Sequence, residues 1–465
     1  MSAFNIQLAA YGEQDYYLTG NPDISFFKKV YRRHTHFAKE LVNIHFTKDG
    51  GVSNFDHNFQ APILRKGELL SNLYLEMDID CKLEDKDKPS YTVCNFLNSL
   101  IKNASIKIGS SVIEKYLSQW KQIKYELTHP KTKHYTMTSN KGGCQTVFDF
   151  KSENVINDNL RSTFSHEDIM NGCAPIVVGG GGGSNNETDN NVEHSGTITK
   201  KLLYTFDFWF TRNIGMALPI ICLKNHDVVL EFDIESKEEL IGRSGFNDGI
   251  DMDTFLIKNI KLRGEYIHLY GDEKRKFTNN DHEYLIEQVQ FKDNLSTSET
   301  ENGTKLTNIS YTLNSFKHPI KCIAWVVQNK GTAKNNKGMG PCYFTSLTQS
   351  SMYDTDGIDG TCNIKFNGIS RTQELPMIYF TRLYPQQLCS SIPSLDRIGF
   401  YSFSLRPFDH QPSGTCNMSK IREKSIELEI ANNNLENVRN KKLFIFAINY
   451  NVFRLSNGIA GLLFN

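Results

Sequence analysis

The sequence lacks the cysteine spacings of metal sites and redox motifs. Its ten cysteines are scattered along the 465 residues, and no two of them form a CxxC motif or a zinc-finger pair. The N-terminus also lacks the basic start and apolar core of a secretory signal peptide. These absences predict free thiols in a reducing compartment, with no metal and no other cofactor.

Long hydrophobic runs and a surplus of one charge are missing as well. The longest uncharged apolar stretch, Ile214–Leu223, contains Pro219 and is far shorter than the ~20 residues of a membrane helix. Lys and Arg total 52, and Asp and Glu also total 52. Because a protein that coats nucleic acid needs a cationic surplus, we expect no direct nucleic-acid binding.

Catalytic motifs are equally scarce. There is no GxSxG or HExxH pattern, and the glycine run 179–183 is followed by Ser184 and Asn185 rather than the Lys-Ser/Thr of a phosphate-binding loop. Glu265, Asp272 and Glu273 could form a carboxylate pair for glycoside hydrolysis, but carboxylates are common on any surface. The sequence therefore predicts that the protein is not an enzyme.

What the sequence does contain is alternating hydrophobicity. Apolar residues occupy every second position in Leu73–Asp80, Val228–Ile234 and Ser425–Ile430, with acidic residues between them, as in half-buried strands. Ile320–Val327 and Leu443–Tyr450 are apolar on both faces, which predicts central strands covered on both sides. A length of 465 residues exceeds the ~250–300 that one core supports, so two domains are expected.

Helix signals are few. Leu117–Leu127 has helical spacing and ends before His129-Pro130, and a second helix is predicted over Asn279–Gln288. The chain also repeats LEMDI at 75–79 as LEFDI at 230–234, through either a duplicated domain or two strands of one sandwich. Many strands with long connections predict an all-β protein of sandwich or jelly-roll type.

Several ordered segments closely resemble the major capsid proteins of nucleocytoplasmic large DNA viruses. The first carries the N-terminal signature YGEQDYYLTGNPDISFFKKVYRRHTHFAKE, and the last ends in INYNVFRLSNGIAGLLF. The segments that carry this resemblance are Tyr11–Glu40, Met216–Phe232, Gly264–Gln290, Ser315–Gln328, Tyr401–Ile421 and Ile448–Phe464.

The resemblance implies two tandem eight-stranded jelly rolls with long inserted loops and few short helices. We expect an N-terminal arm over 1–25, a first roll over 26–236 with an exposed insertion at 139–200, and a second roll over 237–465. Three chains would form a homotrimeric, pseudo-hexameric capsomer. Capsomers would tile an icosahedral virion shell, after synthesis in the host cytoplasm. Expected partners are neighbouring capsomers, minor capsid proteins and the internal viral membrane.

The N-terminal signature contains the one dense basic run, which includes Lys28, Lys29, Arg32 and Arg33. These residues are predicted either to contact anionic headgroups or an acidic minor protein beneath the shell, or to form a solvated face with salt bridges. The neighbouring aromatic residues are predicted to be buried at the base of the domain: Phe26, Phe27, Tyr31 and Phe37.

Six Asn-x-Ser/Thr sequons occur, of which Asn186 and Asn302 are the candidate glycosylation sites. The alternative function is a carbohydrate-binding or carbohydrate-hydrolysing β-sandwich protein. That function would need an aromatic-lined groove with convergent polar groups. The chain has only three tryptophans, at 120, 209 and 325, so the capsid interpretation is preferred.

Overall fold

The structure is a computed structural model. It describes residues 5, 8–10, 12–29, 31–47, 55–82, 90–92, 96–129, 177–178, 197–243, 255–296, 308–329, 340–342, 344, 360–393, 397–429 and 441–464. The chain divides into two units, Met1–Phe37 and Ala38–Asn465. The first unit contains helix α2 (Glu13–Thr19) followed by extended chain, with Asn21 in the left-handed region (φ 50°) as expected for a Gly-Asn-Pro-Asp turn.

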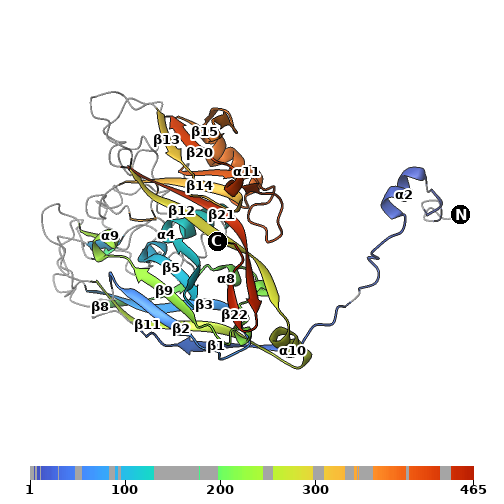
Figure 1. Ribbon diagram of the computed structural model, residues 1–465, viewed down its shortest axis with the longest axis horizontal. Helices are drawn as coiled ribbons and strands as arrows, with labels where there is room; N and C mark the ends of the chain where they lie inside the picture. The colour runs from blue at the N-terminus through green and yellow to red at the C-terminus, as the bar shows by residue number, and fades with distance from the viewer. Residues whose placement is uncertain are drawn as a thin grey trace, which may run out of the picture. The chain divides into compact units, whose positions relative to one another are not determined.

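The second unit begins with two four-stranded antiparallel sheets that enclose one hydrophobic core (Figure 1). The first sheet has the order β1 (Phe37–Ile44), β11 (Phe255–Leu269), β3 (Leu69–Lys82), β8 (Thr197–Thr205). The second has the order β2 (Asn58–Ile63), β9 (Val228–Ile234), β5 (Ile101–Ile108), β6 (Ser111–Leu117). Strand β11 lies beyond residue 236 in the sequence, yet it pairs with β3.

Alternating side chains build this core, as predicted from the sequence. In β9 every second residue is buried, and in β3 the side chains of Leu73, Leu75, Met77 and Ile79 are almost fully buried. The LEMDI and LEFDI segments lie in β3 and β9, in the two sheets of the same sandwich. The echo therefore reflects two equivalent strands rather than a duplicated domain.

A second pair of antiparallel sheets follows. One has the main order β12 (His282–Ser296), β21 (Lys441–Ser456), β14 (Pro319–Asn329), β18 (Ile398–Ser402), with β19 (Cys416–Asn417) and β22 (Ile459–Leu462) attached. The other has the main order β13 (Asn308–Thr312), β20 (Lys424–Glu429), β15 (Thr361–Phe366), β16 (Ile369–Ser370), with β17 (Leu375–Pro376) attached. Each pair of sheets thus has eight strands on its main paths.

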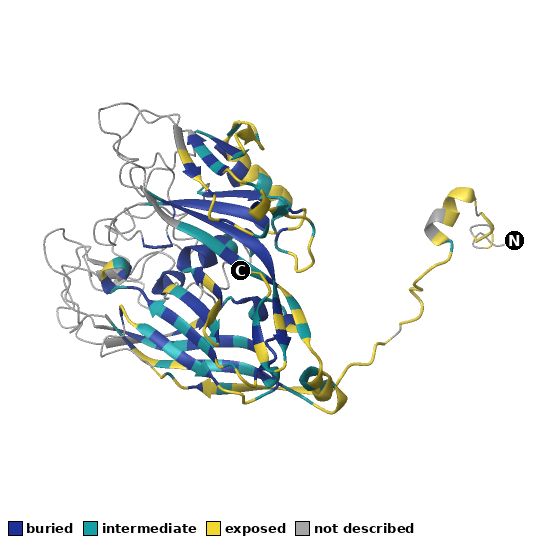
Figure 2. Cartoon of the chain, in the orientation of Figure 1, coloured by how far each residue is buried: buried dark blue, intermediate teal, exposed yellow. Residues whose placement is uncertain are grey.

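The sheet formed by β12, β21, β14 and β18 is covered on both faces. Along β21, Leu443, Ile445 and Ala447 belong to the core of the second sheet pair, whereas Phe444, Phe446 and Ile448 face the core of the first. Figure 2 shows β14 and β21 as buried along most of their length. This confirms the prediction, made from runs that are apolar on both faces, that both strands are central.

Short helices and a small sheet complete the described part of the chain. Among the described residues, no helix has the length and apolar character needed to cross a bilayer. The small sheet contains β10 (Ile241–Arg243), β4 (Ser90–Thr92) and β7 (Val177–Val178). The helices are α3 (Phe96–Leu100), α4 (Ser118–Thr128), α8 (Trp209–Arg212), η1 (Ile214–Met216), η2 (Ile220–Cys222), α9 (Lys237–Leu240), α10 (Asp272–Asn279), η3 (Tyr379–Leu383), α11 (Tyr384–Leu388) and η4 (Met418–Lys420).

One predicted helix is present and the other is wrong. Helix α4 coincides with the predicted 117–127 segment and packs between the two sheet pairs, where Trp120 meets Phe446 with 5.7 Å between ring centroids. The predicted helix over 279–288 is instead the end of α10 followed by β12. Pairing of β12 with β21 along its length overrides the weak local helical spacing.

Candidate functional site

The basic residues of the arm are solvent-exposed. Lys28, Lys29, Arg32 and Arg33 form no ion pair with any other described residue, and Lys29 lies over the Tyr31 ring with 6.0 Å between its Nζ and the ring centroid. Their role as base contacts stays a prediction.

Within the unit Met1–Phe37, the aromatic residues beside this basic run pack into no core, and their burial at the base of the domain stays a prediction. Phe26, Phe27 and Tyr31 are 91%, 100% and 82% exposed, and Phe37 is 50% exposed. The reason is that the segment between α2 and β1 adopts no helix or strand in its described residues, and so it presents no face to a core.

The candidate glycosylation sites Asn186 and Asn302 lie outside the described residues. Among the other sequons, Asn103 lies in β5 and donates its side-chain amide to Asp233 at 2.6 Å. A side chain held in this way within a sheet is a poor acceptor for a sugar.

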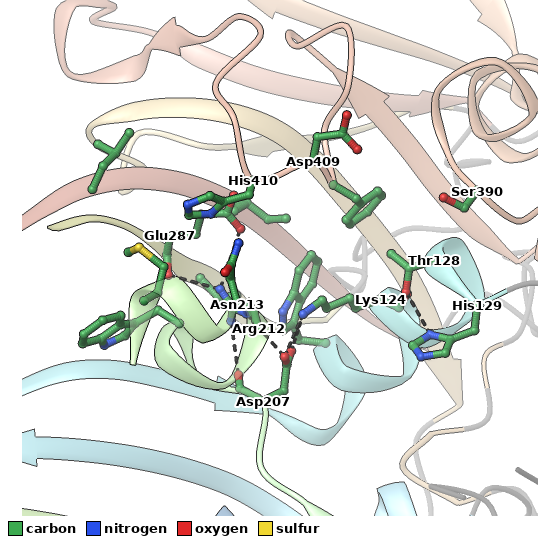
Figure 3. A pocket seen from close by; sticks show the side chains of 17 residues that line it. Lys124, Thr128, His129, Asp207, Arg212, Asn213, Glu287, Ser390, Asp409 and His410 are labelled. Carbon is green, nitrogen blue, oxygen red and sulfur yellow. Dashed lines mark hydrogen bonds and ion pairs between the residues drawn. The ribbon is translucent and has the colours of Figure 1, made fainter. Parts of the chain in front are cut away.

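The described residues also form a cleft of about 620 Å³ between the two sheet pairs (Figure 3). Helix α4 and the segment around α8 contribute one wall, and β12 and the loop that carries His410 contribute the other. The charged and polar side chains lining the cleft are Lys124, Thr128, His129, Asp207, Arg212, Asn213, Glu287, Ser390, Asp409 and His410.

A partly buried ionic network lies at the base of this cleft. The Arg212 Nη2 donates to Glu114 Oε1 at 2.5 Å and its Nε to Asp207 Oδ1 at 3.3 Å, while the Lys124 Nζ donates to both Asp207 oxygens at 2.7 and 2.8 Å. The Arg212 Nη1 donates to the Glu287 backbone carbonyl at 3.3 Å. Glu287 in turn pairs with the fully buried Lys321.

Burial and charge pull the pKa values of this network in opposite directions. Burial raises the pKa of Glu114 to about 7, although the Arg212 charge acts to lower it. Burial also acts to raise the pKa of Asp207, but the charges of Lys124 and Arg212 outweigh it, and the pKa lies well below its usual value. Burial lowers the pKa of Lys124 despite the nearby Asp207.

The charged groups of this network pair with one another and with the backbone. Each carboxylate of the network accepts hydrogen bonds from a cation or a backbone amide, as Glu114 does from Trp209 N at 2.7 Å. In the described part of the chain, no group of His, Cys, Asp and Glu is placed to hold a metal ion.

Family profiles cover almost the whole chain. Residues 25–270 match the profile "Major capsid protein N-terminus", and residues 273–461 match "Large eukaryotic DNA virus major capsid protein". The chain belongs to this family of major capsid proteins.

Individual relatives agree with the family profiles. The chain is 30% identical to the major capsid protein of Pyramimonas orientalis virus, covering 99% of this chain and 98% of that protein. It is 28% identical to the major capsid protein of Paramecium bursaria Chlorella virus 1, with 98% of each covered.

Solved capsid structures show the same fold. A chain of the PBCV-1 virus capsid matches with a TM-score of 0.67 at 23% identity, covering 95% of this chain and 100% of that one. The Faustovirus major capsid protein matches with a TM-score of 0.62 at 10% identity, covering 96% and 94%. The two eight-stranded sheet pairs are therefore the two jelly rolls of the predicted all-β fold.

A major capsid protein is a structural component of the virion shell rather than an enzyme. The features that the carbohydrate alternative invoked have structural roles here. Trp120 and Trp209 are almost fully buried and pack on Phe446 and Phe453 of the second roll. Glu265 is held by Lys39 at 2.8 Å.

The sequence interpretation missed the inter-roll network of this capsid protein. A signal existed, because Glu114, Arg212 and Lys321 are charged residues within strongly apolar stretches. A charge in such a stretch needs a buried partner. The sequence could not say which of the many carboxylates supplies it.

Proposed function

We propose that three copies of this major capsid protein form one pseudo-hexameric capsomer, and that such capsomers tile an icosahedral shell. The observation that carries the proposal is the presence of two jelly rolls in one chain, each with eight described strands on its main sheet paths. Three such chains supply six similar jelly rolls, and closed three-fold symmetry prevents open-ended aggregation.

The molecular mass in solution tests this proposal. Light scattering on the purified full chain is expected to give about 159 kDa, three times the chain mass of 53.1 kDa, because closed symmetry limits growth. Dilution should not dissociate this species at micromolar concentration. A stable, concentration-independent monomer would contradict self-assembly without a further protein.

We retain an arm and two rolls as the proposed domain organisation, with revised boundaries. The expected arm over 1–25 lengthens to about residue 36, because the first strand of the first roll begins at Phe37. The expected division at 236/237 moves to the region between Leu269 and His282, because β11 pairs with β3 of the first roll. The matches of the two family profiles, which meet at residues 270 and 273, support the same division.

We also propose that the arm binds a negatively charged partner beneath the shell, through Lys28, Lys29, Arg32 and Arg33. Supporting this, all four cations are exposed and lack ion pairs among the described residues, and they alternate with exposed aromatic rings. Cations attract an anionic surface, while the rings gain free energy by leaving water. The partner is either an acidic minor capsid protein or the headgroups of the internal membrane.

Neutralising the four cations tests the arm proposal. Substitution of all four by Ser should leave the thermal unfolding of the rolls unchanged and should weaken binding to an anionic partner. Sedimentation with phosphatidylcholine vesicles, with and without phosphatidylserine, measures binding to anionic headgroups. Co-purification with minor capsid proteins from virions measures binding to an acidic protein. Equal binding of the wild type and the variant in both assays would contradict the proposal.

The proposed sugar attachment at Asn186 and Asn302 is tested separately. Peptide mass spectrometry on protein taken from virions would detect added hexose mass at either residue. Unmodified peptides covering both positions would remove them as glycosylation sites.

A further inference from the structure

Near the contact between the rolls, each jelly roll contains charged side chains that pair with one another. In the first roll, Glu114 of β6 and Asp207 receive hydrogen bonds from Arg212 and Lys124. In the second roll, Glu287 of β12 is paired with Lys321 of β14, whose side chain is completely buried. Most charged groups at this contact therefore have a partner of opposite charge within their own roll.

One guanidinium group connects the two networks. Arg212 directs its Nη1 to the second roll, with 3.3 Å to the Glu287 backbone oxygen and 3.8 Å to its Oε2 (Figure 3). Its other nitrogens are held in the first roll, where Nη2 also donates to the Asp207 backbone oxygen at 3.2 Å. Because the guanidinium group is planar and rigid, its orientation in the first roll fixes the direction of the Nη1 hydrogen bond.

The apolar contacts between the rolls cannot set this direction by themselves. Trp120 packs on Phe446 and Trp209 packs on Phe453, with ring centroids 5.7 and 5.2 Å apart. Hydrophobic burial is non-directional, so rings of this kind stabilise contact across a range of angles. Other hydrogen bonds also join the rolls: Gln288 Nε2 of β12 donates to the Ile113 carbonyl of β6 at 2.5 Å, and Asn225 N donates to the Gly458 carbonyl at 3.0 Å.

We propose that Arg212 is a positioning residue that fixes the angle between the two jelly rolls and thereby sets the geometry of the capsomer. The inference rests on the proposed trimer for its biological consequence, because six blocks close into a ring only if adjacent blocks meet at a constant angle. The bond to a backbone carbonyl of β12 suits this role, since the position of that carbonyl is held by the pairing of β12 with β21.

Conservative substitution separates positioning from simple stabilisation. Arg212→Lys keeps a positive charge beside Glu114 and Asp207, but a single ammonium group cannot hold three directions. We expect R212K to unfold at close to the wild-type temperature. Small-angle X-ray scattering on the full-length protein, compared with wild type in the same oligomeric state, should show a broader distribution of interatomic distances. The trimer association constant should fall about tenfold, the effect of ~1.4 kcal/mol in binding free energy.

Arg263→Lys is the matched control. Arg263 pairs with Glu76 at 2.8 Å, and both residues lie in one sheet of the first roll, on β11 and β3. R263K should match the wild type in scattering and in association. The inference is overturned if R212K also matches the wild type, or if R263K broadens the distribution as much as R212K does.

A stronger variant and the wild type complete the design. Arg212→Met should give a larger broadening than R212K, and if it fails to fold, the comparison of R212K with R263K still decides. If the wild type itself proves monomeric, the proposed trimer is wrong. The scattering of the monomers then still tests whether Arg212 fixes the angle between the rolls.

Discussion

At the scale of single residues, close packing and buried charge make specific positions intolerant of change. Gly399 in β18 lies against Trp325 of β14, and a Cβ atom at residue 399 would stand 2.1 Å from the Trp325 ring. A Cβ atom added at Gly461 in β22 would have no other atom within 4 Å. Both glycines are in strands, yet only the first is required by its neighbour.

Gly399→Ala should therefore destabilise the second roll by about 1–3 kcal/mol, the usual effect of overpacking a core. The free energy of unfolding from urea denaturation measures this effect. Gly461→Ala is the control and should change stability by less than about 0.5 kcal/mol. Equal effects of the two substitutions would show that the contact with Trp325 relaxes without cost.

A second prediction at this scale concerns pH. The folded-state pKa of Asp207 lies below its ordinary value of 3.8, so its carboxylate stabilises the fold above pH 3.8. That contribution is lost as the pH falls through the folded-state pKa. Asp207→Asn should cost about 3–5 kcal/mol at pH 7, because it leaves Lys124 and Arg212 without this partner.

The stability difference between wild type and D207N should shrink as the pH falls below 3.8. Urea unfolding of both proteins at a series of pH values measures that difference. A difference that stays constant from pH 7 to the acid limit would mean that the carboxylate charge is not the stabilising feature.

At the scale of elements, the sheet formed by β12, β21, β14 and β18 belongs to both rolls. Successive residues of β21 alternate between the two cores, so Ile445 lies in the second core and Phe446 faces the first. A strand of this kind couples the rolls mechanically, because neither core can open without disturbing it.

Substitution of neighbouring residues in β21 should therefore have distinct effects. Ile445→Ala should cost about 2–5 kcal/mol and Phe446→Ala about 3–5 kcal/mol, because each leaves a cavity. Only Phe446→Ala removes a contact between the rolls, so it should split one calorimetric unfolding transition into two. One transition in F446A together with two transitions in I445A would contradict this assignment of faces.

At the scale of the whole molecule, the balance of charge bears on how capsomers associate. With 52 basic and 52 acidic residues the chain carries no net charge, so we expect electrostatic contacts between the proposed capsomers to be local pairs rather than a general attraction. Local pairs between exposed side chains are weak and are screened by salt. Such contacts permit errors in a growing shell to be corrected.

Purified shells should accordingly dissociate into intact capsomers as salt rises from about 0.1 M to about 1 M, where the screening length falls from about 10 Å to about 3 Å. The capsomer, which we expect to be joined by more apolar contacts, should survive. Light scattering across the salt series measures both events. Shells that stay unchanged at all salt concentrations would show that their contacts are mainly apolar.

The sequence by itself determined the features that depend on local pattern. Alternation identified β3, β9 and β20, the runs that are apolar on both faces identified β14 and β21, and helical spacing identified α4. These predictions succeeded because the side-chain periods of strand and helix are visible within a few residues. The family resemblance supplied the jelly-roll topology, which alternation could not.

Only the tertiary structure decided features that depend on distant residues. Residues 282–288 form a strand because β21 lies beside them, more than 150 residues later. Two of the three carboxylates that contact Arg212, those of Glu114 and Glu287, lie 98 and 75 residues away from it in the sequence. Long-range pairing selects one partner from many equivalent ones, and no local pattern records that choice.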